Sequence, residues 1–300
     1  MINYSSCPVC NSKKISSVFS AIDYTVSKSN FSIWECEICS FRFTQDVPSP
    51  HEIGPFYQSD AYISHTDTKE GLVNRLYHSV RNFTLKSKRK LVEIQTQKSS
   101  GNMLDVGCGT GAFLNEMKSS GWTITGLEPD EQASKNAHEL YNITTKKPDQ
   151  LFHLPKNNFD AITMWHVLEH VHQLPEYLET LKELLTDNGV LFIAVPNYTS
   201  YDASHYKQCW AAYDVPRHLY HFSPKSMELL LSTFGLKLKT IKPMWFDSFY
   251  VSMLSEQIKN NKGNIIKAFF IGALSNVNAI FNRKKCSSVI YVIEKKVQKV

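Results

Sequence analysis

The chain has no apolar run of the roughly 18 residues that a membrane-spanning helix needs. Residues 1–7 also lack the basic segment and the apolar core of a secretion signal. A strong charge of one sign is missing too, and the net charge of +5 is too small to indicate nucleic-acid binding by itself. We therefore expect a cytoplasmic, globular protein, for which 42% hydrophobic and 20% charged residues are ordinary values.

Four of the seven cysteines form two Cys-x-x-Cys pairs, Cys7 with Cys10 and Cys36 with Cys39. Without a secretion signal, such pairs indicate metal binding rather than disulfides. Two such pairs with strands around them are typical of a zinc ribbon, in which four thiolates surround one structural ion. We expect this module at residues 1–47; the alternative is a redox dithiol or thiols that are close by chance. The stretches with strand character are 17–19, 31–35 and 41–44.

A proline-rich break opens the connector at residues 48–100. Apolar residues recur at helical spacing over 71–98, which predicts a helix. We expect its basic run, 86–90, to be a solvated face of that helix. The aromatic-rich residues 57–66 are either a flap over a ligand or a packed connector.

The stretch 102–113 combines a short apolar strand, a turn with three glycines at alternate positions and the start of a helix. Glycine permits close backbone approach, and the N-terminus of the helix offers free N–H groups. Asp105 ends this strand, and Glu128 follows the next apolar run, where an acid can hold both hydroxyls of a ribose. These features predict a nucleoside-containing cofactor in a Rossmann-like site. The three glycines are Gly107, Gly109 and Gly111.

Strand and helix patterns alternate over residues 101–196, which predicts a parallel sheet with helices on both faces. Further along, a helix at 224–234 precedes two more strands that enclose a helical insertion at about 246–286. We assign 101–300 to this single α/β domain and expect ligands at the carboxyl ends of its strands. The expected strands after the first are 122–127, 143–145, 159–165, 190–195, 236–243 and 288–295, and the other expected helices are 130–141 and 174–185.

The glycine turn alone does not choose the cofactor, because Gly107-x-Gly109-x-x-Ala112 also satisfies the dinucleotide fingerprint. Four motifs in order resemble those of class I S-adenosylmethionine-dependent methyltransferases, and this resemblance covers about residues 100–243. Within that class the chain is similar to the branch of the ubiquinone-biosynthesis O-methyltransferases. Its four-cysteine module also resembles that of nucleotide-sugar C-methyltransferases. The four motifs are Asp-Val-Gly-Cys-Gly-Thr-Gly at 105–111, Gly-Leu-Glu-Pro-Asp at 126–130, Phe-Asp-Ala-Ile-Thr-Met-Trp-His-Val-Leu-Glu-His-Val at 159–171 and Asn-Gly-Val-Leu-Phe-Ile-Ala-Val-Pro-Asn at 188–197.

The resemblance implies a sheet of seven strands with the last one antiparallel, and S-adenosylmethionine as the cofactor. It implies that Asp105 lies at the methionine part, that Glu128 holds the ribose hydroxyls and that Asp149 lies near the adenine. The expected cofactor-binding residues are Asp105, Gly107, Cys108, Gly109, Gly111, Glu128, Asp149, Trp165 and His166.

Methyl transfer requires the protein to align the acceptor, remove its proton and exclude water. His166, one residue past the 159–165 strand, is the first candidate for contact with the acceptor or the cofactor. The resemblance further implies a divalent metal at Glu169 and His170, although these two residues alternatively only brace the turn.

A second group of candidates lies in the loop at residues 213–221. Arg217 is a candidate clamp for a carboxylate or phosphate of the acceptor, and His218 and His221 are candidate bases. The alternative is that Arg217 and Asp214 form a salt bridge that shapes the loop.

The favoured interpretation is an O-methyltransferase for a small-molecule or glycan acceptor. Alternatives are an RNA methyltransferase, a nucleotide-sugar C-methyltransferase and a non-catalytic protein that binds S-adenosylmethionine. The balanced charges of residues 1–47, with four Lys or Arg against four Asp or Glu, argue against nucleic acid. The apolar and then basic segment 265–285 is either a peripheral membrane contact, part of the core or a lid. The acceptor and the oligomeric state stay open.

Overall fold

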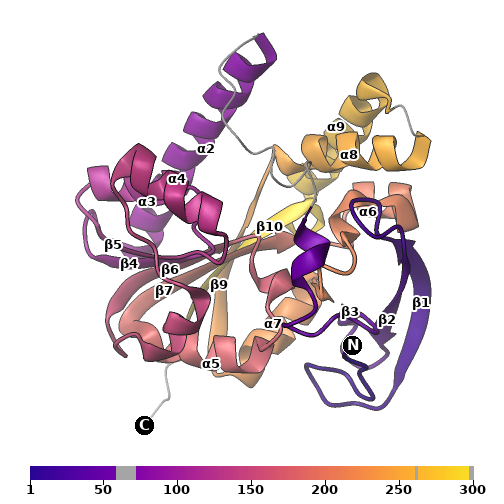
Figure 1. Ribbon diagram of the computed structural model, residues 1–300, viewed down its shortest axis with the longest axis horizontal. Coiled ribbons are helices and arrows are strands. Elements are labelled where there is room, and N and C mark those ends of the chain that lie inside the picture. The colour runs from indigo at the N-terminus through magenta and orange to yellow at the C-terminus, as the bar shows by residue number, and fades with distance from the viewer. Residues whose placement is uncertain (59–71, 261–262, 297–300) are drawn as a thin grey trace.

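Two β-sheets organise the computed structural model, which describes residues 1–58, 72–260 and 263–296 (Figure 1). The smaller sheet has the order β1-β2-β3-β8 and the larger one the order β5-β4-β6-β7-β10-β9. The strands of the smaller sheet are β1 (Ile15–Ile22), β2 (Asn30–Cys36), β3 (Arg42–Thr44) and β8 (Tyr220–His221). The strands of the larger sheet are β4 (Asn102–Val106), β5 (Thr123–Leu127), β6 (Phe159–Trp165), β7 (Leu185–Pro196), β9 (Leu236–Pro243) and β10 (Ser288–Lys295).

The larger sheet has the predicted Rossmann-like arrangement. Strand β4 pairs in parallel with β5 and β6, and β6 pairs in parallel with β7. The last strand, β10, is antiparallel to both of its neighbours, β7 and β9. The fold class predicted from the sequence is thereby confirmed.

The strand expected at 143–145 differs from the structure. In the described part of the chain it is reduced to a single parallel bridge between Leu127 and Lys146, so the sheet has six strands rather than seven. Ile143 is the only buried residue of the expected strand. Pro148, which has no N–H to donate, then begins the 3-10 turn η2 (Pro148–His153).

Helices cover both faces of the larger sheet (Figure 1). One group of helices covers each face. Neighbouring residues of a strand point to opposite faces, so Met103 of β4 packs against the helices of the first group and Leu104 against those of the second. The first group is α2 (Leu72–Thr96), α3 (Ala112–Ser119) and α4 (Glu131–Tyr141), and the second is α5 (Leu174–Leu184) and α7 (Pro224–Thr233). Ser223, the N-cap of α7, accepts the backbone N–H of Ser226 and forms a capping box with it.

The N-terminal module shares its core with the rest of the chain. Strand β8, from the late loop, completes the smaller sheet by pairing with β3. The ring of Phe41 lies 5.6 Å from that of Tyr220 and 5.5 Å from that of Phe222, between ring centroids. The structure of the first 47 residues therefore depends on contacts with a segment that lies far away in the sequence.

The predicted helical insertion is a pair of helices, α8 (Asp247–Asn260) and α9 (Ile265–Phe281), which packs with α6 (Tyr201–Tyr206). None of the described helices combines the length and the apolarity that a membrane span requires. Most of the proposed flap, residues 59–66, lies outside the described residues. The remaining short turns are η1 (Gly54–Tyr57), η3 (Leu168–His170), η4 (Lys207–Cys209), η5 (Ala211–Tyr213) and η6 (Arg283–Lys285).

Candidate functional site

A buried acid lies at the carboxyl end of β4. Asp105 is 1% exposed, and its Oδ1 accepts a 2.6 Å hydrogen bond from the hydroxyl of Thr163 on β6. Burial raises the pKa of Asp105 to about 7, against the opposing effects of Thr163 and Lys88. A cationic group of a ligand would stabilise the charged form of this buried carboxylate. The end of β4 is therefore a position that favours positive charge.

The glycine turn after β4 contains three residues with positive φ, namely Gly107 (71°), Gly109 (55°) and Gly111 (76°). A Cβ on Gly107 would lie 2.5 Å from a methyl carbon of Val167, so this glycine is required by packing. A Cβ on Gly109 would meet no atom within 4 Å. Gly109 is therefore the position at which the backbone lies open to a ligand, as a phosphate- or nucleoside-binding turn requires.

Glu128 joins the end of β5 to this turn. Its Oε2 accepts the backbone N–H of Gly109 at 2.7 Å, and its Oε1 accepts that of Asp130 at 2.9 Å. Burial raises the pKa of Glu128, against these two hydrogen bonds, which lower it. Each carboxylate oxygen has a further lone pair, so Glu128 can still accept the two hydroxyls of a ribose.

Two of the other expected cofactor residues have different surroundings. Cys108 is 8% exposed, and its sulfur faces Gly126 inside the fold, so only its backbone is available to a ligand. Asp149 is exposed in the first turn of η2. No contact in the structure tests its expected place near the adenine, which stays a prediction.

A lysine that the sequence did not single out lies near the carboxyl ends of β4 and β6. The ammonium of Lys88 lies 4.2 Å from the centroid of the Trp165 ring at the end of β6. The Nε1–H of Trp165 is buried without a hydrogen-bond partner among the described residues. The interpretation of the run 86–90 as a solvated helix face is therefore wrong for Lys88, because this side chain turns toward the ends of the strands.

His166 lies directly after β6 in a left-handed conformation, with φ of 58°. Its Nε2 lies 3.0 Å from Oδ2 of Asp247, and its Nδ1 lies 3.4 Å from Oε1 of Glu169. Burial by itself lowers the pKa of His166, but these two carboxylates raise it to about 10. His166 thus lies at the end of β6, and its expected contact with the cofactor or the acceptor stays a prediction.

Glu169 and two neighbouring histidines form a group that could hold a metal ion. Both carboxylate oxygens are buried and form no hydrogen bond with any described residue. His170 and His218 each offer a ring nitrogen, and the three ligand atoms lie within 4.8 Å of one another. The sequence indicated Glu169 and His170, but the structure adds His218 to them.

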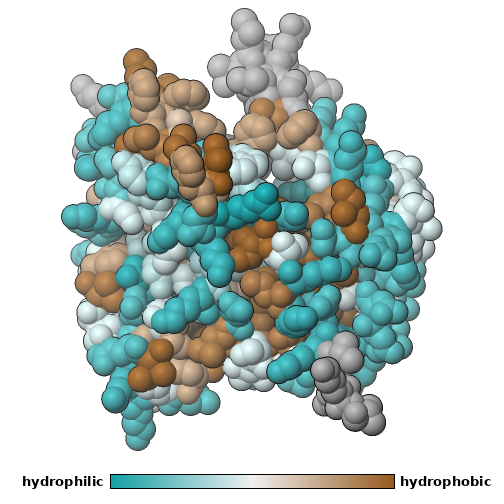
Figure 2. Space-filling view, turned by 180° about the vertical axis from the view of Figure 1, so that it is seen from behind, coloured by the Kyte–Doolittle hydropathy of each residue, from teal (hydrophilic) through white to brown (hydrophobic). Residues whose placement is uncertain are grey.

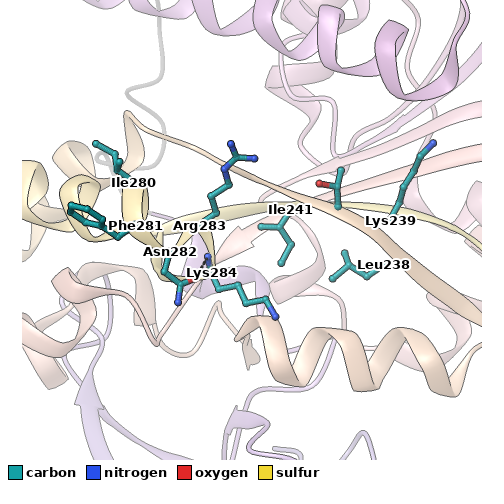
Figure 3. Close-up of a pocket in the computed structure, with 9 residues that line it drawn as sticks. Leu238, Lys239, Ile241, Ile280, Phe281, Asn282, Arg283 and Lys284 are labelled. Atoms are coloured by element: carbon teal, nitrogen blue, oxygen red, sulfur yellow. Dashed lines mark hydrogen bonds between the residues drawn. The ribbon is translucent and has the colours of Figure 1, made fainter.

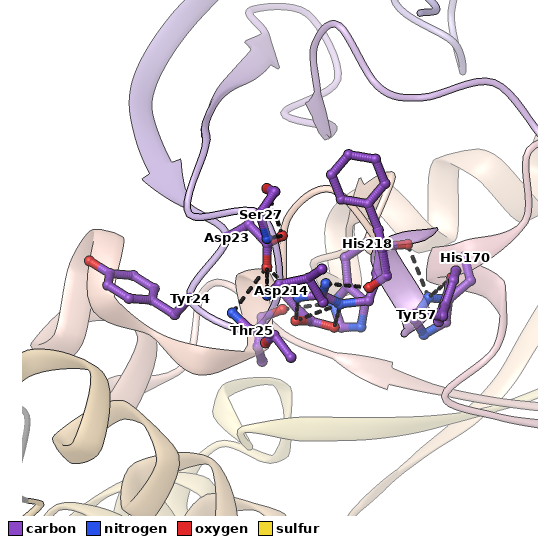
Figure 4. Close-up of polar contacts among 12 residues, drawn as sticks. Asp23, Tyr24, Thr25, Ser27, Tyr57, His170, Asp214 and His218 are labelled. Atoms are coloured by element: carbon purple, nitrogen blue, oxygen red, sulfur yellow. Dashed lines mark hydrogen bonds and ion pairs between the residues drawn. The ribbon is translucent and has the colours of Figure 1, made fainter. Parts of the chain in front are cut away.

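The two histidines of this group are oriented by backbone carbonyls. Nδ1 of His218 lies 2.8 Å from the carbonyl oxygen of Ala212, and Nδ1 of His170 lies 3.0 Å from that of Arg217. If each Nδ1–H donates to its carbonyl, the lone pair is on Nε2. This arrangement is typical of metal-binding histidines. Tyr57 also lies beside His170, with its hydroxyl 3.1 Å from Nδ1 (Figure 4).

Arg217 is not placed as a clamp for an acceptor. Its guanidinium is fully buried and donates to both oxygens of Asp214, to Asp23 at 3.0 Å and to the carbonyl of Phe56 at 2.8 Å. Asp23 also accepts backbone N–H groups of its own loop, including that of Thr25 (Figure 4). The alternative interpretation, a salt bridge that shapes the loop, matches this geometry, and the bridge also ties the loop to the N-terminal module.

His221 is likewise not placed as a base. It lies buried in β8, with Nε2 3.0 Å from the hydroxyl of Thr44 on the neighbouring strand β3. Burial, followed by the charges of His218 and Arg42, keeps its pKa well below the usual value. Its polar ring stabilises the smaller sheet, and the assignment as a catalytic base is corrected accordingly.

The four cysteines of the N-terminal pairs meet at one point. The sulfurs of Cys7 and Cys39 are 3.5 Å apart, as are those of Cys10 and Cys36, and all four lie within 4.8 Å of one another. Four sulfurs at about 2.3 Å from one tetrahedral zinc ion are separated by about 3.8 Å. The arrangement fits the zinc ribbon expected from the sequence.

Known proteins resemble part of this chain in sequence. A family profile described as a methyltransferase domain matches residues 78–241. The ubiquinone biosynthesis O-methyltransferase of Actinobacillus pleuropneumoniae serotype 5b is 37% identical over 120 residues, which cover 34% of this chain and 50% of that protein. The mitochondrial ubiquinone biosynthesis O-methyltransferase of Homo sapiens is 27% identical over 163 residues, 49% of this chain and 44% of that protein. The matched region thus spans about half the length of these curated relatives or less.

A solved structure shows the same fold. It comes from Galdieria sulphuraria, is described as a candidate sarcosine dimethylglycine methyltransferase and aligns with a TM-score of 0.51 at 16% identity. The alignment covers 76% of this chain and 89% of that chain. At this identity the match supports the fold and carries no information on the substrate.

Proposed function

The chain belongs to the family of methyltransferase domains, and from this premise we propose that it transfers a methyl group from S-adenosylmethionine to an oxygen atom of a small-molecule or glycan acceptor. The observation that carries the proposal is the open backbone at Gly109, which lies between the buried Asp105 and Glu128. The relatives named as ubiquinone biosynthesis O-methyltransferases support an oxygen as the acceptor atom.

The residues of the crevice have separate tasks in this proposal. Glu128 accepts the two ribose hydroxyls while it holds the N–H of Gly109. Asp105 attracts the amino group of the methionine part, and Trp165 lies beside the bound cofactor at the end of β6. The cofactor, when bound, supplies a methyl group on a sulfonium whose leaving group needs no activation. The remaining work of the protein is to orient the acceptor and exclude water.

We further propose that Cys7, Cys10, Cys36 and Cys39 hold one structural zinc ion. Four thiolates complete a tetrahedron and leave no open position for a substrate. The ion therefore fixes the N-terminal module, and the module in turn supports the loop that contains His218 through Arg217 and Asp23.

A second divalent metal is proposed at Glu169, His170 and His218. The buried carboxylate of Glu169, which accepts no hydrogen bond from a described residue, and the oriented imidazoles support it. Such an ion would lower the pKa of an acceptor hydroxyl and orient it. Among the described residues, the nearest charged partner of Glu169 is His166, with Nδ1 3.4 Å from Oε1.

We expect Mn²⁺ to bind to the wild-type chain at this second site, and His218→Ala to weaken that binding by about 10- to 100-fold, the usual cost of losing an important group at a metal site. The measurement is the loss of the free Mn²⁺ signal in electron paramagnetic resonance during a titration. His138→Ala, an exposed histidine of α4, is the matched control and keeps the wild-type affinity. Equal Mn²⁺ binding by the wild type and His218→Ala would rule out the second metal at these residues.

The activity itself is tested with S-adenosylmethionine labelled on its methyl group. We expect label in at least one hydroxyl compound from a panel of phenols, hydroxy acids and sugars, together with release of S-adenosylhomocysteine. Label found only in RNA, or only on a carbon atom of a nucleotide sugar, would contradict the proposed acceptor atom.

A further inference from the structure

Helix α9 exposes an unusually apolar face. Its inward residues, such as Ala268, Gly272 and Ser275, are small and buried, so α9 lies close to its neighbours α8 and α6. Eight large apolar side chains point the other way and are between 45% and 87% exposed. We call them the apolar face of α9: Ile265, Ile266, Phe269, Phe270, Leu274, Val277, Ile280 and Phe281. Figure 2 shows apolar side chains gathered at the upper left of the molecule, over α8 and α9.

A basic segment follows this face directly. Arg283, Lys284 and Lys285 are exposed, and no described carboxylate forms an ion pair with any of them. Residues 264–287 contain no Asp or Glu at all. The apolar face therefore ends at a cluster of positive charges that no described carboxylate neutralises.

A groove of about 520 Å³ lies at the C-terminal end of α9, beside β9 (Figure 3). Its apolar lining includes Leu238, Ile241 and Phe281. Its basic lining is supplied by Lys239, Arg283 and Lys284. The groove thus combines apolar walls with cations, which is complementary to an anionic phospholipid headgroup and the start of its acyl chains.

The charge pattern argues against a second copy of the chain as the occupant. A two-fold contact brings the same patch of both copies together, so each basic segment would need an acid on the other copy. The segment 264–287 offers none. In contrast, an apolar face with a basic border is the pattern of helices that lie flat in the interface of an anionic bilayer.

We propose that the apolar face of α9, together with residues 283–285, binds the surface of a bilayer that contains anionic phospholipids. Helix α9 has 17 residues and lies along this surface, with its aromatic and aliphatic side chains among the lipid headgroups and upper acyl chains. Asp247, the first residue of α8, contacts His166, so the docked helix pair begins beside the cofactor crevice. Bilayer binding does not depend on the proposed methyl transfer.

The test is flotation of the full chain with vesicles of phosphatidylcholine, with or without phosphatidylglycerol. We expect the wild type to float with the anionic vesicles and to bind the neutral ones much more weakly. The double variant Ile266→Asp/Phe281→Asp should lower the partition coefficient by about tenfold or more, because two apolar contacts become repulsive charges. Arg283→Ala/Lys284→Ala should lower it by about fivefold for each charge removed.

The matched control is Leu140→Asp, which places the same charge at a 56% exposed leucine of α4 and should bind like the wild type. Circular dichroism spectra and melting temperatures establish that all variants are folded. The proposal is overturned if the wild type does not float with anionic vesicles, or if the α9 variants bind these vesicles as well as the wild type does. It is equally overturned if the wild type is a dimer in sedimentation analysis that Ile266→Asp/Phe281→Asp converts to monomers.

Discussion

Removing the proposed zinc ion, by chelation or by Cys36→Ser, should unfold residues 1–47 and destabilise the whole chain. A structural zinc ion contributes on the order of 10 kcal/mol to the folding of small modules, which cannot bury enough apolar surface alone. Strand β8 pairs with β3, and Phe41 packs on Tyr220 and Phe222, so the loss extends into the main fold. We expect a loss of about 5 kcal/mol or more, which corresponds to a fall in melting temperature of roughly 10–20 °C.

Calorimetry of the wild type, of the chelated protein and of Cys36→Ser measures this effect, with elemental analysis for zinc. Cys209→Ser is the control, since Cys209 lies outside the cluster and the same exchange should leave both the zinc content and the melting temperature nearly unchanged. A wild type without bound metal, and with the same melting temperature as Cys36→Ser, would refute the zinc assignment.

Replacing Glu128 with Ala should weaken the binding of S-adenosylmethionine on the order of 100-fold. The ionised carboxylate is proposed to accept two ribose hydroxyls, and each hydrogen bond to a charged group contributes about 1.5–3 kcal/mol. The variant also loses the hydrogen bond that holds the N–H of Gly109 in place. The affinity for S-adenosylmethionine should therefore fall for two reasons: the direct contacts with the ribose are lost, and the glycine turn is held less firmly.

Equilibrium dialysis with labelled S-adenosylmethionine gives the dissociation constants. Glu128→Gln keeps one acceptor oxygen and should have an intermediate affinity. Glu131→Ala removes an exposed acid three residues further on and is expected to bind like the wild type. Unchanged affinity of Glu128→Ala would refute the ribose assignment while leaving the fold untouched.

The sequence predicted the features that depend on local pattern. The alternation of apolar strands and helices, the order of the motifs and the paired cysteines led to the fold, to the family and to the sulfur cluster. The acids at the strand ends were also identified, since in a parallel sheet the carboxyl ends of neighbouring strands lie at one edge. The expected strand at 143–145 was reduced to a bridge because only Ile143 of that segment is buried.

Contacts between segments far apart in the sequence were not predictable from such patterns. Arg217 was expected at the acceptor, but its partner Asp23 lies 194 residues away. Asp247 reaches His166 across 81 residues, and nothing around it in the sequence signals that role. A polar residue in a loop offers the same chemistry to a substrate as to another segment of its own chain, and only the tertiary fold decides between them.

The binding of wild-type protein to S-adenosylhomocysteine and to NAD, measured by isothermal titration calorimetry, tests the central claim most directly. Both ligands carry an adenosine, and the glycine turn alone satisfies the fingerprint of either class. We predict that one S-adenosylhomocysteine binds per chain and that NAD neither releases heat nor competes with it. Binding of NAD in place of S-adenosylhomocysteine would contradict the assignment of the crevice at Asp105, Gly109 and Glu128 to a methyl donor.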